Sequence, residues 1–292
     1  DHTTTLKYDI EEWNSSGTSV IWVKVPSVAA SSQVSIFMYY NYNSATDSQD
    51  KASVWSYYSG VWNMDKTGVK YIDGTLTGNP DGNYAKATGE TGFTVKDITG
   101  PVGGPAISLG NDARIDTQKK LNIMTGYKTT VSYWIRSTAT NGNDTAWQAP
   151  AIYGISDDWV DEIYFGFMDA SGFLGTNTGN GDEMKSNFII NDGNWRHVTM
   201  TRDDVSGMCE FYVNGVLNNS GTTPAGTKDT AGKESFSWGA MRSYFYGDVF
   251  YYLKSDLDNI RVKADVLNSD RIKADYKFGS HNAISYSSVE TL

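Results

Sequence analysis

The sequence predicts an all-β protein built around an antiparallel β-sandwich, on three observations. Short segments rich in Val, Ile, Tyr, Phe and Trp recur along the 292 residues and are separated by turn residues. The chain has 29 glycines but only 6 prolines, which suits many short strands joined by tight turns. Asn214-Gly215 lies between two such segments and is the residue pair that two-residue hairpin turns prefer.

Composition limits the classes of function. A formal net charge of −10 opposes binding to nucleic acid or to an anionic membrane. No run of eighteen apolar residues occurs, so we expect no membrane span. The single cysteine, Cys209, excludes an intrachain disulfide and is expected to be a buried thiol. The aromatic content of 13%, with many Asn, Ser and Thr, is typical of extracellular β-proteins, so we expect an extracellular or cell-surface location.

The first strand candidates are residues 20–25 and 34–40, whose spacing across Pro26 and a small-residue loop predicts a hairpin. Residues 54–64 carry Trp and Tyr side chains that could bridge two domains. Residues 67–104 are rich in Gly, Asn, Asp and Thr, and we expect long loops there.

Further strands are expected through the rest of the chain, at a density that favours a sandwich or jelly roll over a helical fold. Near the end, residues 268–276 combine a polar cap with apolar residues four apart, which predicts one or two helical turns. The expected strands are residues 106–109, 129–136, 151–155, 163–168, 187–190, 196–202, 209–213, 236–238 and 258–262.

Several of these segments carry a family resemblance. From about Trp62 to about Phe278 the chain resembles a laminin-G-like, concanavalin A-type jelly roll of the bacterial kind, which implies a jelly-roll domain over residues 62–292. The resemblance is carried, in the order of the family, by residues 131–136 (VSYWIR), 193–198 (GNWRHV), 211–215 (FYVNG), 257–262 (LDNIRV) and 267–272 (LNSDRI).

Residues 1–61 resemble a second family, a small β-domain of unassigned function that precedes such jelly rolls in bacterial and archaeal surface proteins. The matching elements are residues 12–14 (EWN), 22–26 (WVKVP), 39–41 (YYN) and 53–55 (SVW). That family usually has additional strands ahead of the position that Asp1 occupies in this chain. One hypothesis is that a partner supplies these strands by strand addition. The alternative is that the domain closes against the jelly roll.

Catalytic patterns are absent from the sequence. A retaining glucanase on this fold needs two carboxylates about 5 Å apart on one strand face. The nearest acidic cluster, residues 157–162, lacks the Glu-x-Asp-x-Glu pattern and is expected to be a solvated loop. No arrangement of Ser, His and Asp supports nucleophilic catalysis, and His197 lies where the family commonly has a structural histidine. We therefore predict that the protein is not an enzyme.

The resemblance also implies a structural Ca²⁺, held between an early loop and the aspartate of a late strand by hard oxygen ligands. The matching positions are Asp73, Asn79, Asp81 and Asp258. Asp73 and Asp81 each precede a glycine, and such pairs are also ordinary turn signals.

Aromatic side chains in two loops are the candidates for ligand contact, because sugars stack on exposed rings. The loops are residues 141–162 and 241–256, the second of which is longer than in the family pattern. The predicted ligand-binding residues are Trp147, Tyr153, Trp159, Tyr244 and Tyr246. The alternative is that these rings pack the interior.

We therefore expect a secreted or surface-attached, non-enzymatic module that binds a polysaccharide or glycan, or that mediates adhesion, with Ca²⁺ in a supporting role. Two alternatives stay open: a structural subunit of a surface layer, sheath or filament that self-associates by strand exchange, and a polysaccharide-degrading enzyme.

Overall fold

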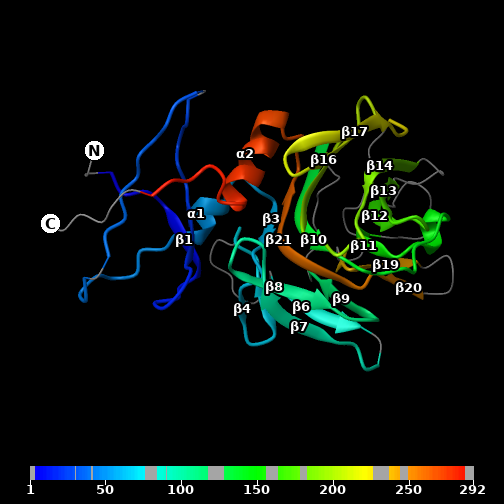
Figure 1. Ribbon diagram of the computed structural model, residues 1–292, viewed down its shortest axis with the longest axis horizontal. Coiled ribbons are helices and arrows are strands. Elements are labelled where there is room, and N and C mark those ends of the chain that lie inside the picture. The colour runs from blue at the N-terminus through cyan, green and yellow to red at the C-terminus, as the bar shows by residue number, and fades with distance from the viewer. Residues whose placement is uncertain are drawn as a thin grey trace.

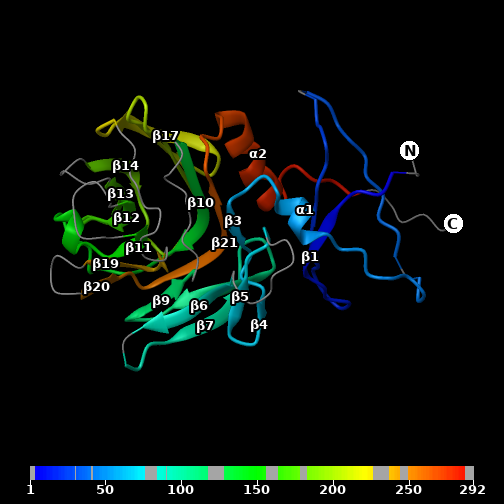
Figure 2. The same cartoon turned by 180° about the vertical axis from the view of Figure 1, so that it is seen from behind.

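The computed structural model describes residues 4–29, 31–40, 42–75, 84–89, 91–117, 128–155, 164–177, 183–225, 237–243 and 249–286. Two large sheets face each other, and a smaller N-terminal unit covers the outer side of one of them (Figures 1 and 2). The predicted all-β jelly roll is confirmed. None of the helices in these ranges is long and apolar enough to cross a membrane.

The first sheet contains eight of the described strands in the order β17-β16-β15-β10-β21-β8-β7, with β3 paired to β21. All of its pairings are antiparallel. Its strands are β3 (Gly60–Trp62), β7 (Val95–Thr99), β8 (Pro105–Leu109), β10 (Lys128–Arg136), β15 (Arg196–Asp203), β16 (Met208–Val213), β17 (Val216–Thr222) and β21 (Ser255–Lys263).

The second sheet contains eleven described strands in the order β14-β13-β12-β11-β18-β9-β6-β5-β4, with β19 and β20 added beside β11. Its pairings are antiparallel apart from a bridge between β11 and β20. Its strands are β4 (Lys66–Thr67), β5 (Lys70–Ile72), β6 (Tyr84–Gly89), β9 (Ala113–Asp116), β11 (Ala151–Ile155), β12 (Tyr164–Met168), β13 (Phe173–Asn177), β14 (Glu183–Ile189), β18 (Ser237–Trp238), β19 (Ala240–Ser243) and β20 (Val249–Tyr252).

The core lies between the two sheets. Along β10, Val131, Tyr133 and Ile135 point into it, as the two-residue period of a strand requires. The ring of Tyr133 lies 5.9 Å from the rings of both Tyr153 and Trp238 on the second sheet, between ring centroids. Burying these large aromatic groups is the main stabilising contribution that ties the sheets together.

The β16–β17 hairpin confirms the predicted Asn-Gly turn. Val213 pairs with Val216, and the two residues between them, Asn214 and Gly215, have φ angles of 51° and 75°. Asn and Gly accept this left-handed conformation at low cost, and the resulting turn follows the twist of the strands.

Helix α2 (Ser269–Gly279) confirms the helix predicted near the end of the chain. Its N-cap is Asn268, whose side chain accepts a hydrogen bond from the main-chain N–H of Arg271. Figure 1 shows that α2 lies over the outer side of the first sheet. Ile272 packs there in a second apolar cluster that includes Val61 and Tyr212.

The N-terminal unit consists of β1 (Tyr8–Glu12), β2 (Val20–Val23) and α1 (Lys51–Trp55), followed by a chain reversal into β3. The predicted hairpin between residues 20–25 and 34–40 is wrong. Strand β2 pairs with β1, and residues 34–40 lie outside the assigned strands. Residues 67–104 are also not merely loops, because they contain β5, β6 and β7. The proposed boundary between residues 61 and 62 falls inside β3.

Strand β1 was not predicted from the sequence because its buried side chains are acidic. Asp9 and Glu11 point inward and accept hydrogen bonds from the indole N–H groups of Trp55 (2.7 Å) and Trp22 (2.5 Å). The guanidinium carbon of Arg261, on β21, lies 4.6 Å from the ring centroid of Trp22 and 5.0 Å from that of Trp55. Together with Tyr58, at 5.8 Å, the two tryptophans form an aromatic cage around Arg261. This cage fixes the N-terminal unit to the first sheet.

We predict that Arg261→Ala lowers the free energy of unfolding by roughly 2–4 kcal/mol, because it removes a buried cation–π group and leaves the indoles without their packing partner. Arg136→Ala is the matched control. Arg136 also stacks on one ring, that of Trp195, and pairs with Asp256, but its side chain is 38% exposed, so a loss below about 1 kcal/mol is expected. If chemical denaturation gave equal losses of unfolding free energy for the two variants, the structural role assigned to Arg261 would be contradicted.

His197 is held neutral by its surroundings. It is buried against the rings of Trp134 and Tyr276, at centroid distances of 5.3 Å and 6.0 Å. Burial, with a contribution from the positive charge of Arg261, lowers the pKa of His197 to about 3. Between that value and the ordinary histidine pKa, the unfolded chain binds a proton that the folded chain does not. The stability that the protein gains by keeping His197 neutral is therefore fully present above about pH 6.5 and is lost as the pH falls below that value.

We predict that the wild-type protein loses about 2 kcal/mol more stability than His197→Gln between pH 7 and pH 5, as measured by denaturant titration at each pH. The variant keeps every carboxylate and the other two histidines, so the difference isolates His197. Parallel stability curves for the two proteins would show that His197 is charged in the folded state.

Candidate functional site

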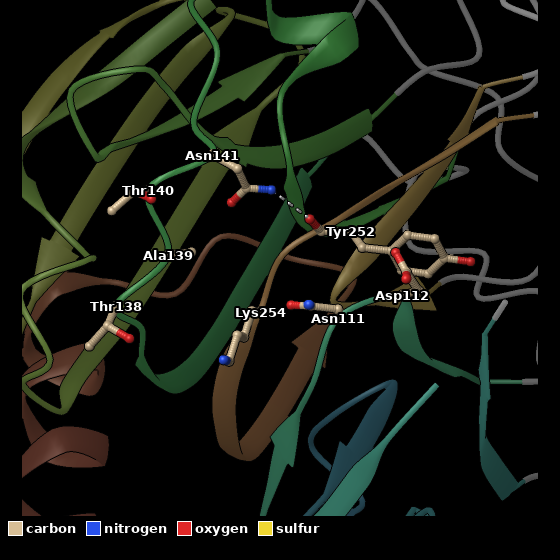
Figure 3. Close-up of a pocket in the computed structure, with 8 residues that line it drawn as sticks. All are labelled: Asn111, Asp112, Thr138, Ala139, Thr140, Asn141, Tyr252 and Lys254. Carbon is tan, nitrogen blue, oxygen red and sulfur yellow. Dashed lines mark hydrogen bonds between the residues drawn. The ribbon is translucent and has the colours of Figure 1, made fainter. Parts of the chain in front are cut away.

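A polar pocket opens at one edge of the sandwich, where three segments meet (Figure 3). They are the turn between β8 and β9, the segment that follows β10, and the junction between β20 and β21. The pocket has a volume of about 460 Å³, within the range of small-molecule sites. It is lined by Asn111, Asp112, Thr138, Ala139, Thr140, Asn141, Tyr252 and Lys254.

Hydrogen bonds hold the second and third segments together. The hydroxyl of Ser137 donates to the main-chain oxygen of Lys254 (2.7 Å) and accepts from the N–H of Ala139 (3.1 Å). The Asn141 amide donates to the main-chain oxygen of Tyr252 (3.5 Å), as Figure 3 shows. These hydrogen bonds therefore fix the position of the pocket wall that the two segments form.

The first segment is a tight turn. Asp112 has a φ angle of 58°, a left-handed conformation that Asp tolerates better than most residues. The main-chain oxygen of Asp112 lies so close to Gly89 that a β-carbon there would approach it to 1.9 Å. Gly89 thus allows β6 to pair with β9 right up to this turn.

The lining groups can form hydrogen bonds of both kinds. Asn111 and Asn141 each carry a donor and an acceptor, the threonine hydroxyls can do either, Asp112 accepts and Lys254 donates. The hydroxyl of Tyr252 accepts a hydrogen bond from Arg114 (3.1 Å), which orients the half-buried ring. A compact molecule with many hydroxyl groups suits this combination of polar groups with one aromatic ring.

The predicted ligand-binding residues have different outcomes. Tyr153 is fully buried against Tyr133 and Trp238, so its prediction as a contact residue is corrected: the ring faces the core, where large apolar surfaces are buried. Trp147 lies in a 3₁₀ helix (Ala146–Gln148), and its side chain is not described. Trp159, Tyr244 and Tyr246 lie outside the described residues and stay predictions.

Sequence reasoning found two of the three loops but named other residues in them. Asn141 begins the first predicted loop, and Tyr252 and Lys254 belong to the second. Asn111, Asp112, Thr138 and Thr140 were missed. The Asn-Asp pair signals only a turn, and nothing local in the sequence shows that this turn meets one segment about 27 residues and another about 140 residues further along the chain.

The predicted Ca²⁺ ligands also have different outcomes. Asp73 is buried, and one of its carboxylate oxygens accepts hydrogen bonds from the N–H groups of Val61 (3.1 Å) and Thr75 (2.9 Å) and from the Thr75 hydroxyl (2.8 Å), so it anchors a turn. Asn79 and Asp81 lie outside the described residues. The part of the chain that the structure describes contains no cluster of three or more His, Cys, Asp or Glu suited to a metal.

Asp258 differs from Asp73. Its side chain is fully buried, and its Oδ2 atom has no hydrogen-bond partner among the described residues. Burial raises the pKa of Asp258 to about 7. The orphaned oxygen is what a cation ligand requires, so Asp258 fits the predicted role.

Comparison with known families and structures agrees with this architecture. Residues 109–273 match the concanavalin A-like lectin/glucanases superfamily, and residues 1–79 match DUF2341, a domain of unknown function. No curated protein sequence matches the chain.

Solved structures share the fold at low sequence identity. The binding domain of Paraclostridial Mosquitocidal Protein 1 has a TM-score of 0.54 and 15% identity over 76% of this chain and 52% of that one. Domain 4 of AbnA, an extracellular arabinanase from Geobacillus stearothermophilus solved with arabinotriose, has a TM-score of 0.54 and 19% identity over 74% and 97%. A mutant Trypanosoma rangeli sialidase with trans-sialidase activity has a TM-score of 0.53 and 12% identity over 80% and 34%.

This chain therefore spans about half of the toxin binding domain and nearly all of the arabinanase domain. At these identities the likeness establishes the fold and transfers no individual residue. Since the superfamily match covers more than half of the 292 residues, the chain belongs to the concanavalin A-like lectin/glucanases superfamily.

Proposed function

We propose that the protein is a non-enzymatic binding module, extracellular or attached to a cell surface, that recognises a glycan through the pocket between β8, β10 and β21. The observation that carries the proposal is the pocket itself, in which hydroxyl, amide, carboxylate and ammonium groups surround one space beside an oriented tyrosine ring. The arabinanase domain, which was solved with a sugar, supports it as an example of glycan recognition on the same fold.

The charges of the pocket favour binding over hydrolysis. Glycoside hydrolysis generally requires a pair of carboxyl groups on either side of the bond that is cleaved. Among the eight lining residues, Asp112 carries the lone carboxylate, and Lys254 carries the opposite charge. These groups can hold a sugar by hydrogen bonds, but they do not form an acid–base pair.

We predict that Asn141→Ala and Tyr252→Ala each weaken glycan binding about five- to tenfold, since each removes hydrogen-bonding or stacking contacts worth about 1–1.5 kcal/mol. A glycan array identifies the ligand, and calorimetry with that ligand measures each variant. Asn187→Ala is the matched control, because this exposed amide bonds to Asn218 away from the pocket.

Tyr252→Phe separates the two roles of the tyrosine: it keeps the ring and removes the hydroxyl that accepts from Arg114. Unchanged binding in both alanine variants would place the glycan site elsewhere. Release of reducing sugar from polysaccharides by the wild-type protein would instead support the enzyme alternative.

A second candidate function, self-association as a structural subunit, rests on an exposed apolar segment in the N-terminal unit. Residues 25–46 contain no charged side chain in a chain of net charge −10. Within them Ile36, Met38 and Tyr40 are 48%, 62% and 53% exposed. A second copy is the partner we propose, because two acidic chains can approach each other through such a neutral surface without like-charge repulsion.

We predict that Met38→Lys abolishes concentration-dependent association in sedimentation velocity, because it places a positive charge in each copy at the contact. Val205→Lys makes the same change at a residue that is 69% exposed on the distant β15–β16 turn, and association should persist. A wild-type protein that stays monomeric at all concentrations would contradict this candidate.

A further inference from the structure

Buried oxygen atoms without donors gather where the N-terminal unit meets the first sheet. Glu11 Oε1, Asp258 Oδ2 and Asn63 Oδ1 have no hydrogen-bond partner among the described residues. Their residues are 7%, 0% and 3% exposed, so bulk water does not reach them freely. An unpaired buried acceptor is costly, and three from different elements need an explanation.

The register of the sheet places two of them in the same region. Trp62 of β3 pairs with Ile260 of β21, so Asn63 lies beside the part of β21 that contains Asp258. Ile260 and Trp62 point into the core, and strand alternation directs Asn63 to the outer side of the sheet, toward the N-terminal unit. Glu11 reaches the same side from β1.

A single glycine turn lies against both carboxylates. A β-carbon on Gly100 would lie 2.1 Å from Asp258 Oδ2, and one on Gly104 would lie 1.9 Å from Glu11 Oε1. These two glycines are themselves joined by a hydrogen bond from the Gly100 N–H to the Gly104 oxygen (2.9 Å). The unpartnered oxygens of Glu11 and Asp258 therefore both face the same turn.

The two nearby cations have other partners. Arg261 donates to the Asn259 side chain (3.0 Å) and stacks on the aromatic cage. Lys51 pairs with Asp65 and Asp9.

We propose that Glu11, Asp258 and Asn63 hold a Ca²⁺ ion that fastens the N-terminal unit to the jelly roll. The resemblance of the fold implies a calcium ion at Asp258; the new element is that Glu11, from outside the jelly roll, is a ligand, and that Asp73 is not. Carboxylate and amide oxygens are hard ligands that suit Ca²⁺ rather than softer metals. Further ligands to reach roughly six to eight are water or main-chain oxygens.

The test uses the full chain after treatment with EDTA, titrated with CaCl₂ and followed by calorimetry and by the melting temperature. Ca²⁺ should bind the wild-type protein and raise its melting temperature, because a ligand that binds only the folded state stabilises it. Glu11→Gln and Asp258→Asn should each weaken binding at least tenfold. They should melt no lower than the wild-type protein in EDTA, because each replaces a buried carboxyl group that has an oxygen without a donor by a neutral amide.

Two matched controls separate the ligands from their neighbours. Glu12→Gln changes the next carboxylate of β1, which is less buried than Glu11, and Asp73→Asn changes the aspartate that anchors a turn. Both should bind Ca²⁺ like the wild-type protein, even where Asp73→Asn melts lower.

Proteolysis gives a second readout that requires no variant to fold. Ca²⁺ should protect the wild-type protein from cleavage between β2 and α1, since the ion fastens the unit that contains them. No binding by the wild-type protein would overturn the proposal. Wild-type affinity in Glu11→Gln would overturn the role of the N-terminal unit, and loss of affinity in Asp73→Asn would restore the ligand set predicted from the sequence.

Discussion

The stacking of Arg261 in its aromatic cage is the interaction on which the arrangement of the N-terminal unit and the jelly roll depends. A guanidinium in the interior is tolerated only where rings and acceptors replace its hydration, and here two tryptophans, a tyrosine and the Asn259 side chain do so. The tryptophans are in turn oriented by Asp9 and Glu11. Through this chain of contacts the outer side of β21 determines where the N-terminal unit lies.

Strand β21 connects the pocket, the proposed calcium site and the cage. It begins directly after Lys254, which lines the pocket, continues through Asp258 at the proposed calcium site, and reaches Arg261 in the cage. Its other side supplies Leu257, Ile260 and Val262 to the core. Because one strand with a buried inner face carries all three features, the pocket and the attachment of the N-terminal unit share one rigid element.

Local sequence patterns were sufficient to predict segments whose structure depends on residues close together in the chain. The Asn214-Gly215 turn, the strands with apolar inner faces such as β10 and β15, and the cap of α2 at Asn268 were predictable because turn geometry, alternation and capping act within a few residues. Strand β1 was not predictable in this way, because its buried residues are the acidic Asp9 and Glu11. Residues 34–40 have strand-forming side chains, yet β2 pairs with β1 instead.

The sequence by itself determined the fold class, the family, the acidic character and the loops in which a ligand site could lie. Only the tertiary structure decided which side chains meet: that Tyr153 enters the core, that Asn111 and Asp112 join Asn141 and Lys254 around one pocket, and that Glu11 approaches Asp258. The reason is that propensity and periodicity are local, whereas these contacts join segments separated by up to about 250 residues, which only the packing of the two sheets and the N-terminal unit brings together.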